Sequence, residues 1–272
     1  MHRNAGFVAI VFLAQLLGCS DIEREVSVAT PASEFGMHYV VTGTGEPVVL
    51  VHGFSQTHKA WLDTPVYQDL TRDHKVIAVD LRGHGDSDKP HDPMAYGRQM
   101  QSDLVKLLDR LDIDSAHFIG FSMGARIVGD LVVASPGRMR TASMVSGYFT
   151  TWHEGEEEFA QETEHRASES ERYPWEPDNQ DYHALAAVIR GTRYSVVSPD
   201  EVASISTPTL IVFGSIELEH MPESFRAGLE RLPSSVDVLI IDGADHDSSH
   251  AAILNPAFTH AVRGHIASHP SL

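Results

Sequence analysis

Short runs of β-branched and other apolar residues, bounded by glycine or polar residues, alternate along this chain with longer stretches of helical periodicity. Such runs predict buried β-strands. The predicted strands are Met37–Thr42, Pro47–Val51, Lys75–Asp80, Ala116–Gly120, Ala142–Ser146, Leu210–Phe213 and Val236–Ile241. Between them, the apolar positions of Met100–Leu111 recur at three- and four-residue steps, which gives a helix one buried stripe. This alternation predicts an α/β fold, with a mostly parallel central sheet covered by helices on both faces.

The alternation stops between residues 148 and 206, where the sequence becomes polar and acidic. Its acidic residues include Glu154, Glu156, Glu157, Glu158, Glu162 and Glu164. For these glutamates we expect a solvated helix face or a mobile loop. Because strand patterning resumes at Pro208, the whole segment 148–206 is interpreted as a cap inserted before the penultimate strand.

The first twenty residues have a different character. Arg3 precedes an apolar run, Phe7 to Leu17, that is much shorter than the ~20 residues a membrane-spanning helix needs. Such a run is typical of a secretory signal. It ends at Leu16-Leu17-Gly18-Cys19, which resembles the lipobox of bacterial lipoproteins, whose cleavage leaves the cysteine as a lipidated N-terminus. The alternative is an ordinary cleaved signal in which Cys19 has no role.

These features predict three parts: a signal peptide at residues 1–18, a polar tether at 19–35 and a folded domain at 36–272. The lipobox resemblance implies export to the bacterial cell envelope and attachment to a membrane through lipid on Cys19. As Cys19 is the only cysteine, no intramolecular disulfide is possible.

Length and charge limit the possible functions. A chain of 272 residues can bury a substantial core, and one domain with an insertion fits it better than two domains. Its formal net charge of -18 argues against a nucleic-acid partner, because phosphate binding needs clustered lysine and arginine.

A glycine-flanked serine is the main candidate for chemistry. In Gly120-Phe121-Ser122-Met123-Gly124 the motif G-x-S-x-G directly follows the predicted strand Ala116–Gly120 and opens an apolar helical stretch, Ala125 to Ala134. A serine on a sharp strand-to-helix turn has a strained backbone, and glycines two positions away remove the collisions with it. The sequence therefore predicts Ser122 as a nucleophile.

The motif and its setting resemble the α/β-hydrolase family of serine hydrolases. His52-Gly53-Phe54, after the strand Pro47–Val51, resembles the family's His-Gly-x turn, and Asp80 to Ser87 resembles the loop after the next strand. The resemblance implies that the backbone N–H groups of Phe54 and Met123 stabilise an oxyanion. For His52 and for the Asp80 loop we expect structural roles.

The candidates for the general base and its acid partner are identified by their positions after predicted strands. Of seventeen histidines, His246 follows the last predicted strand through a Gly-x-x-His turn that resembles the family's base loop, and a helical stretch from Ile253 to Ile266 comes after it. His250 is its nearest rival. The acid is expected after Leu210–Phe213, where relatives carry an aspartate and this chain carries Glu217; Glu219 remains the competing candidate.

The residues point to a serine esterase that acts on a small carboxylic ester. Serine at position 122 argues against the aspartate-nucleophile chemistry of haloalkane dehalogenases and epoxide hydrolases. There is no H-E-x-x-H motif, one cysteine cannot build a thiolate site, and no phosphate loop is present, so neither metal nor cofactor is expected. The same constellation can also cleave a lactone, an amide or a carbon–carbon bond, or support perhydrolysis. Outside enzymes, the fold can serve as a ligand-binding or signalling module.

Overall fold

An 8-stranded, mostly parallel β-sheet forms the centre of the molecule. The computed structural model describes residues 24–27, 36–149, 155–168, 177–246 and 251–270. The strands are β1 (Arg24–Ser27), β2 (His38–Thr42), β3 (Glu46–Val51), β4 (His74–Val79), β5 (Ala116–Phe121), β6 (Met139–Val145), β7 (Thr209–Gly214) and β8 (Val236–Ile241). They lie in the order β1-β2-β4-β3-β5-β6-β7-β8. Strand β2 is antiparallel to β1 and β4, and the other pairs are parallel.

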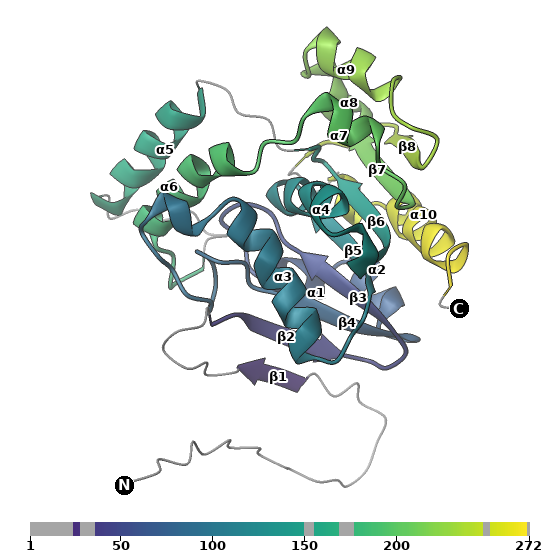
Figure 1. The fold of residues 1–272 in the computed structure, drawn as a ribbon, viewed down its shortest axis with the longest axis horizontal. Coiled ribbons are helices and arrows are strands. Elements are labelled where there is room, and N and C mark those ends of the chain that lie inside the picture. Colours follow the sequence, from purple (N-terminus) through teal and green to yellow (C-terminus); the bar gives the residue numbers. More distant parts are fainter. Residues whose placement is uncertain (1–23, 28–35, 150–154, 169–176, 247–250, 271–272) are drawn as a thin grey trace, which may run out of the picture.

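Helices cover both faces of the sheet, as the periodicity predicted. The helices outside the cap are α1 (Lys59–Leu62), α2 (Pro65–Leu70), α3 (Arg98–Arg110), α4 (Met123–Ala134), α8 (Ser215–Glu219), α9 (Glu223–Leu229) and α10 (Pro256–Ala267). Single 3-10 turns are η1 (Pro93–Ala95), η2 (Pro136–Arg138), η3 (Arg166–Ser168), η4 (Thr192–Tyr194) and η5 (Ala252–Leu254). Helices α3 and α4 lie on the face nearer the viewer in Figure 1.

Successive side chains of each strand point to opposite faces of the sheet, and this divides the core into two layers. Val49 and Val51 of β3 pack with α3 and α4, whereas Val48 and Leu50 pack with α1, α2 and α10 on the opposite face. All four side chains are buried, because strands of a parallel sheet are covered on both sides. The predicted fold class is confirmed. The largest difference in a predicted strand is at β6, which begins at Met139 rather than Ala142.

The N-terminal edge strand was not predicted. β1 lies inside segment 19–35, interpreted as a tether, and pairs antiparallel with β2. Its sequence, Arg-Glu-Val-Ser, is too short and too charged to show a strand period. The predicted signal peptide, residues 1–18, and Cys19 lie outside the described residues. Within the described part of the chain, no helix is long and apolar enough to cross a membrane.

The cap consists of helices inserted between β6 and β7, within the range predicted from the break in strand patterning. They are α5 (Gly155–His165), α6 (Tyr182–Gly191) and α7 (Pro199–Ala203). Helices α5 and α6 pack through Ala160, Ala186 and Ile189. In Figure 1 the pair α5 and α6 lies beyond one end of the sheet strands.

The interpretation of the cap glutamates as a solvated face was wrong for one of them, Glu156; Glu157 and Glu164 are partly exposed but form ion pairs. Arg190 of α6 pairs with Glu157 and Glu164 of α5, each at 3.0 Å. Glu156 is buried and pairs at 3.2 Å with Arg126 of α4. These acids therefore hold the cap helices to each other and to α4.

A matched pair of glycine substitutions tests the packing beneath the cap. A Cβ at Gly124 would lie 2.2 Å from the carbonyl oxygen of Val51, whereas a Cβ at Gly137 meets no atom within 4 Å. We expect Gly124→Ala to lower the free energy of unfolding by about 3 kcal/mol through overpacking. Gly137→Ala should leave it unchanged, as measured by denaturant unfolding. Equal stability of both variants would contradict this packing.

Candidate active site

Ser122 occupies the sharp turn between β5 and α4, where the G-x-S-x-G motif placed it. Its backbone has φ 52° and ψ −114°, a conformation that non-glycine residues seldom adopt. The Ser122 N–H donates to the carbonyl of Val145 on β6 at 2.9 Å, which anchors the turn. A Cβ at Gly120 would lie 2.4 Å from the carbonyl oxygen of Gly124. The two glycines are thus required because the backbones on either side of Ser122 nearly touch.

His246 links Ser122 to a carboxylate. Its Nε2 lies 3.0 Å from Ser122 Oγ, and its Nδ1 lies 2.9 Å from Glu217 Oε1. Because an ionised carboxylate only accepts hydrogen bonds, Nδ1 carries the proton and Nε2 accepts the serine hydroxyl. The arrangement is that of a general base oriented by an acid. His250, the rival base, lies outside the described residues.

Glu217 is the acid that the structure brings to His246, not Glu219. The Glu217 side chain is 5% exposed, whereas Glu219, at the end of α8, is exposed to solvent. Helix α8, which carries the acid, is joined directly to the loop that carries the base: the Ile216 N–H donates to the Ala244 carbonyl at 3.1 Å. A Cβ at Gly214 would lie 2.2 Å from that same oxygen. This close approach holds the segments that carry Glu217 and His246 together.

Phe54 and Met123 have the backbone positions expected of oxyanion donors. Met123 is the first residue of α4, so its N–H has no acceptor within the helix. The Gly53 carbonyl accepts from His52 Nδ1 at 2.7 Å and from the Gln56 N–H at 3.3 Å. In a trans peptide the next N–H, that of Phe54, points away from these donors. The peptide plane before Phe54 is therefore held in one orientation.

His52 has the structural role predicted for it. Its Nε2 accepts from the Leu81 N–H at 3.0 Å, which places the ring proton on Nδ1, where it is donated to Gly53. Burial lowers the pKa of His52, which favours this neutral ring. Because both ring nitrogens of His52 are engaged in these hydrogen bonds, the imidazole cannot also act as the base for Ser122.

The buried carboxylate of Asp80 holds the loops behind the site together. It accepts from His38 Nδ1 at 2.9 Å, from His58 Nδ1 at 2.8 Å, and from the backbone N–H groups of His58 and Asp86. Burial opposes its ionisation, but the hydrogen bonds from the two histidines hold the pKa of Asp80 well below its usual range. Within the described chain, His38, His58 and Asp80 are close enough to share a metal ion. Their mutual hydrogen bonds already account for the cluster.

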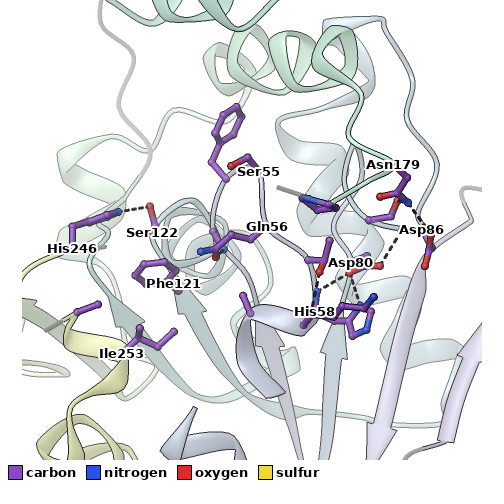
Figure 2. A pocket seen from close by; sticks show the side chains of 18 of the residues that line it. Ser55, Gln56, His58, Asp80, Asp86, Phe121, Ser122, Asn179, His246 and Ile253 are labelled. Atoms are coloured by element: carbon purple, nitrogen blue, oxygen red, sulfur yellow. Dashed lines mark hydrogen bonds and ion pairs between the residues drawn. The ribbon is translucent and has the colours of Figure 1, made fainter. Parts of the chain in front are cut away.

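A pocket of about 1310 Å³ opens beside Ser122. Near Ser122 and His246 it is lined by the apolar side chains of Phe54, Phe121, Phe159, Ala251, Ile253 and Leu254. Its other end is polar and includes His58, Asp80, Asp86 and Asn179, whereas Gln56 lies at the Gly53 turn, nearer to Ser122. Figure 2 shows Ser122 with His246 at one end and Asn179 with Asp86 at the other.

Several pocket residues were not predicted from the sequence. Phe159 of α5 packs against Phe54 with ring centroids 5.5 Å apart, so the cap contributes an apolar wall over the turn. An apolar residue within a run of glutamates was the available signal for it. Asn179 had no sequence signal, because its hydrogen bonds are to Gly85 and Asp86, which folding brings near, and Gln56 bonds within its own turn, to Gly53.

The comparisons with known proteins agree with this architecture. Residues 46–163 match the family model described as alpha/beta hydrolase fold. A thermophilic esterase from Thermogutta terrifontis superposes with a TM-score of 0.74 at 22% identity, covering 93% of this chain and 100% of that one. The chain has the α/β-hydrolase fold.

Curated relatives of this α/β-hydrolase-fold chain match a single segment. Epoxide hydrolase 2 of Siraitia grosvenorii is 32% identical over 118 residues, which are 43% of this chain and 37% of that protein. Esterase YbfF of Escherichia coli (strain K12) is 42% identical over 95 residues, 34% of this chain and 35% of that protein. The match thus spans little more than a third of the length of these relatives. They carry different activities, so the match alone does not select a reaction.

Two glutamine substitutions test the choice of acid. Glu217→Gln keeps the shape of the side chain but removes the charge that orients and stabilises the His246 imidazolium. We expect the rate at which a fluorophosphonate labels Ser122 to fall by about 10³-fold or more. Glu219→Gln is the matched control and should label at the wild-type rate. Loss of labelling in Glu219→Gln, with Glu217→Gln unaffected, would move the assignment to Glu219.

Proposed function

We propose that this chain is a serine hydrolase that cleaves a small carboxylic ester through an acyl-enzyme on Ser122. The observation that carries the proposal is the continuous hydrogen-bonded series Ser122–His246–Glu217, which opens onto a pocket. A serine hydroxyl is a weak nucleophile unless a base removes its proton, and this series supplies the base and orients it.

The reaction follows from the positions of these groups. As Ser122 Oγ attacks the ester carbonyl carbon, its proton passes to His246 Nε2, and the carbonyl oxygen becomes an anion facing the Phe54 and Met123 N–H groups. When the carbon–oxygen bond breaks, His246 returns the proton to the leaving alcohol. A water molecule then attacks the acyl-enzyme, gives its proton to His246 and releases the acid, and the proton returns to Ser122.

The lining of the pocket favours a small, uncharged acyl group. Phe121, Phe159 and Ile253 surround the reacting end with apolar surface. The chain's formal net charge of -18 disfavours anionic lipid aggregates, which acidic cap residues would repel. Lactones, amides and carbon–carbon bonds remain substrates that the same three residues can cleave. Relatives are named as esterases and as (E)-2-((N-methylformamido)methylene)succinate hydrolase.

A substrate panel tests the proposal. We expect the protein to hydrolyse short-chain p-nitrophenyl esters faster than long-chain ones, and Ser122→Ala to lower kcat by at least about 10³-fold. Ser204→Ala, on an exposed surface at the end of α7, is the control and should retain wild-type kcat. Absence of hydrolysis that depends on Ser122, combined with tight binding of a small ligand, would favour a non-catalytic binding module instead.

We also propose that the mature protein is anchored to a bacterial envelope membrane through lipid on Cys19. The support is the apolar run Phe7 to Leu17 followed by Leu-Gly-Cys, and an acylated cysteine holds a domain at a membrane without a spanning helix.

Replacement of the cysteine tests the anchor. Cys19→Ser should move the protein from the membrane fraction to the soluble fraction of fractionated cells, and its N-terminal peptide should lack lipid by mass spectrometry. If the wild-type protein is soluble and its Cys19 unmodified, the segment is an ordinary signal.

A further inference from the structure

The turn that carries Phe54 has a strained backbone. Its four residues, 53 to 56, are closed by the bond from the Gln56 N–H to the Gly53 carbonyl, at 3.3 Å. The Gln56 side chain adds a second bond, because its Oε1 accepts from the Gly53 N–H at 3.0 Å. Ser55, the third residue of the turn, has φ 57°, whereas a positive φ at this place usually belongs to glycine or asparagine. A serine there favours relaxation of the turn, which would move the neighbouring Phe54 N–H.

A hydrogen bond from the cap holds this turn. Nε2 of Gln180, in the loop before α6, donates to the Ser55 carbonyl at 3.2 Å. Gln180 is itself fixed, because its N–H donates to the Pro177 carbonyl at 3.1 Å and the next residue, Asp181, is the N-cap of α6. The Ser55 carbonyl belongs to the same peptide group as the Gln56 N–H, which closes the turn. Both sides of that peptide group are therefore bound.

The cap also holds the side chain of Phe54. This ring packs against the apolar seam between α5 and α6, which is formed by Ala160, Ala186 and Ile189. It also contacts the ring of Phe159, with 5.5 Å between the centroids. The cap thus contacts the turn at two successive residues, through the Phe54 ring and through the Ser55 carbonyl.

Other contacts of the same cap loop do not reach the turn. Asn179 Nδ2 donates to the Gly85 carbonyl at 2.7 Å, and Asp181 pairs with His91 at 3.0 Å. Both partners belong to the segment that follows β4. Loss of the pair with His91 therefore loosens the cap loop without releasing the Ser55 carbonyl.

We infer that the cap positions the oxyanion donor Phe54, and that Gln180 is the positioning residue. The inference rests on the proposed esterase function and gives the cap a part in the chemical step. A donor stabilises the transition state only if it already points to the place where the negative charge forms. When the Ser55 carbonyl is released, the strained turn relaxes and the Phe54 N–H loses that direction. Gln180 is buried and is not among the described residues that line the pocket, so it acts through the turn.

The burial of Gln180 allows a substitution that removes the donor and keeps the fold. The side chain is 6% exposed, and among the described residues its Oε1 has no hydrogen-bond partner. A buried polar atom without a partner lowers stability. Methionine has the same length and a similar shape, so Gln180→Met also removes this unfavourable atom. We expect Gln180→Met to unfold in denaturant as the wild type does, and Gln180→Leu provides a second variant without the donor.

Kinetic constants test the inference. On a short-chain p-nitrophenyl ester, Gln180→Met should lower kcat by about tenfold and leave KM unchanged, because the lost interaction acts in the transition state. A trifluoromethyl ketone, which forms a tetrahedral adduct with Ser122, should bind about tenfold more weakly. His91→Ala is the matched control and should retain both constants. An unchanged kcat in Gln180→Met, or an equal loss in His91→Ala, overturns the inference while leaving the esterase function intact.

Hydrogen exchange gives an answer that does not need turnover. The Gln56 N–H closes the turn, so its exchange rate reports how often the turn opens. It should exchange several-fold faster in Gln180→Met and at the wild-type rate in His91→Ala. If the wild type hydrolyses no ester but exchange differs in this way, the proposed reaction fails and the hold of the cap on the turn stands. If exchange is the same in both variants, Gln180 does not position the turn, whatever the reaction.

Discussion

The geometry of the site depends on the close approach of backbones at the turn between β5 and α4. Without side chains at Gly120 and Gly124, the start of α4 packs against the end of β5 and against the Val51 and His52 carbonyls. Ser122 then has to adopt a positive φ, which costs backbone energy of order 1–3 kcal/mol. The bond to Val145 on the neighbouring strand and the buried sheet beneath offset that cost.

The parallel sheet brings the other groups to the same place. Parallel strands end at one edge, so residues that follow β3, β5, β7 and β8 meet there although they are far apart in the sequence. The Phe54 turn follows β3, Ser122 follows β5, Glu217 follows β7 and His246 follows β8. Contact between the last two loops requires Gly214, whose missing side chain lets the Ala244 carbonyl approach. These residues form a site because each lies at this edge of the sheet, more than because of the sequence around each of them.

This explains what the sequence could and could not predict. Buried parallel strands appear as apolar runs, so their places were predicted to within three residues, whereas the short, charged β1 was missed. Ser122, His246 and Glu217 could be proposed as a site because each follows a recognisable strand, and the structure brings the three side chains together. The pairing of Glu157 and Glu164 with Arg190 was not predicted, because it depends on how two cap helices pack. The groups that orient His58 and Asn179 likewise come from other loops, and no local pattern predicts such bonds.

The cap is tied to the reacting end of the pocket through an ion pair and an aromatic contact. Arg126, which meets Glu156 of α5, follows Ser122 by one helical turn, and its N–H bonds to the Ser122 carbonyl. Phe159, also on α5, contacts Phe54. The cap helix is thus aligned with both α4 and the turn that orients the Phe54 N–H. Because the glutamates that make these contacts are charged, the cap is held by ion pairs and by a small apolar seam rather than by a large core. An enzyme built in this way can vary its cap and loops to change substrates while the sheet keeps the reacting groups in place.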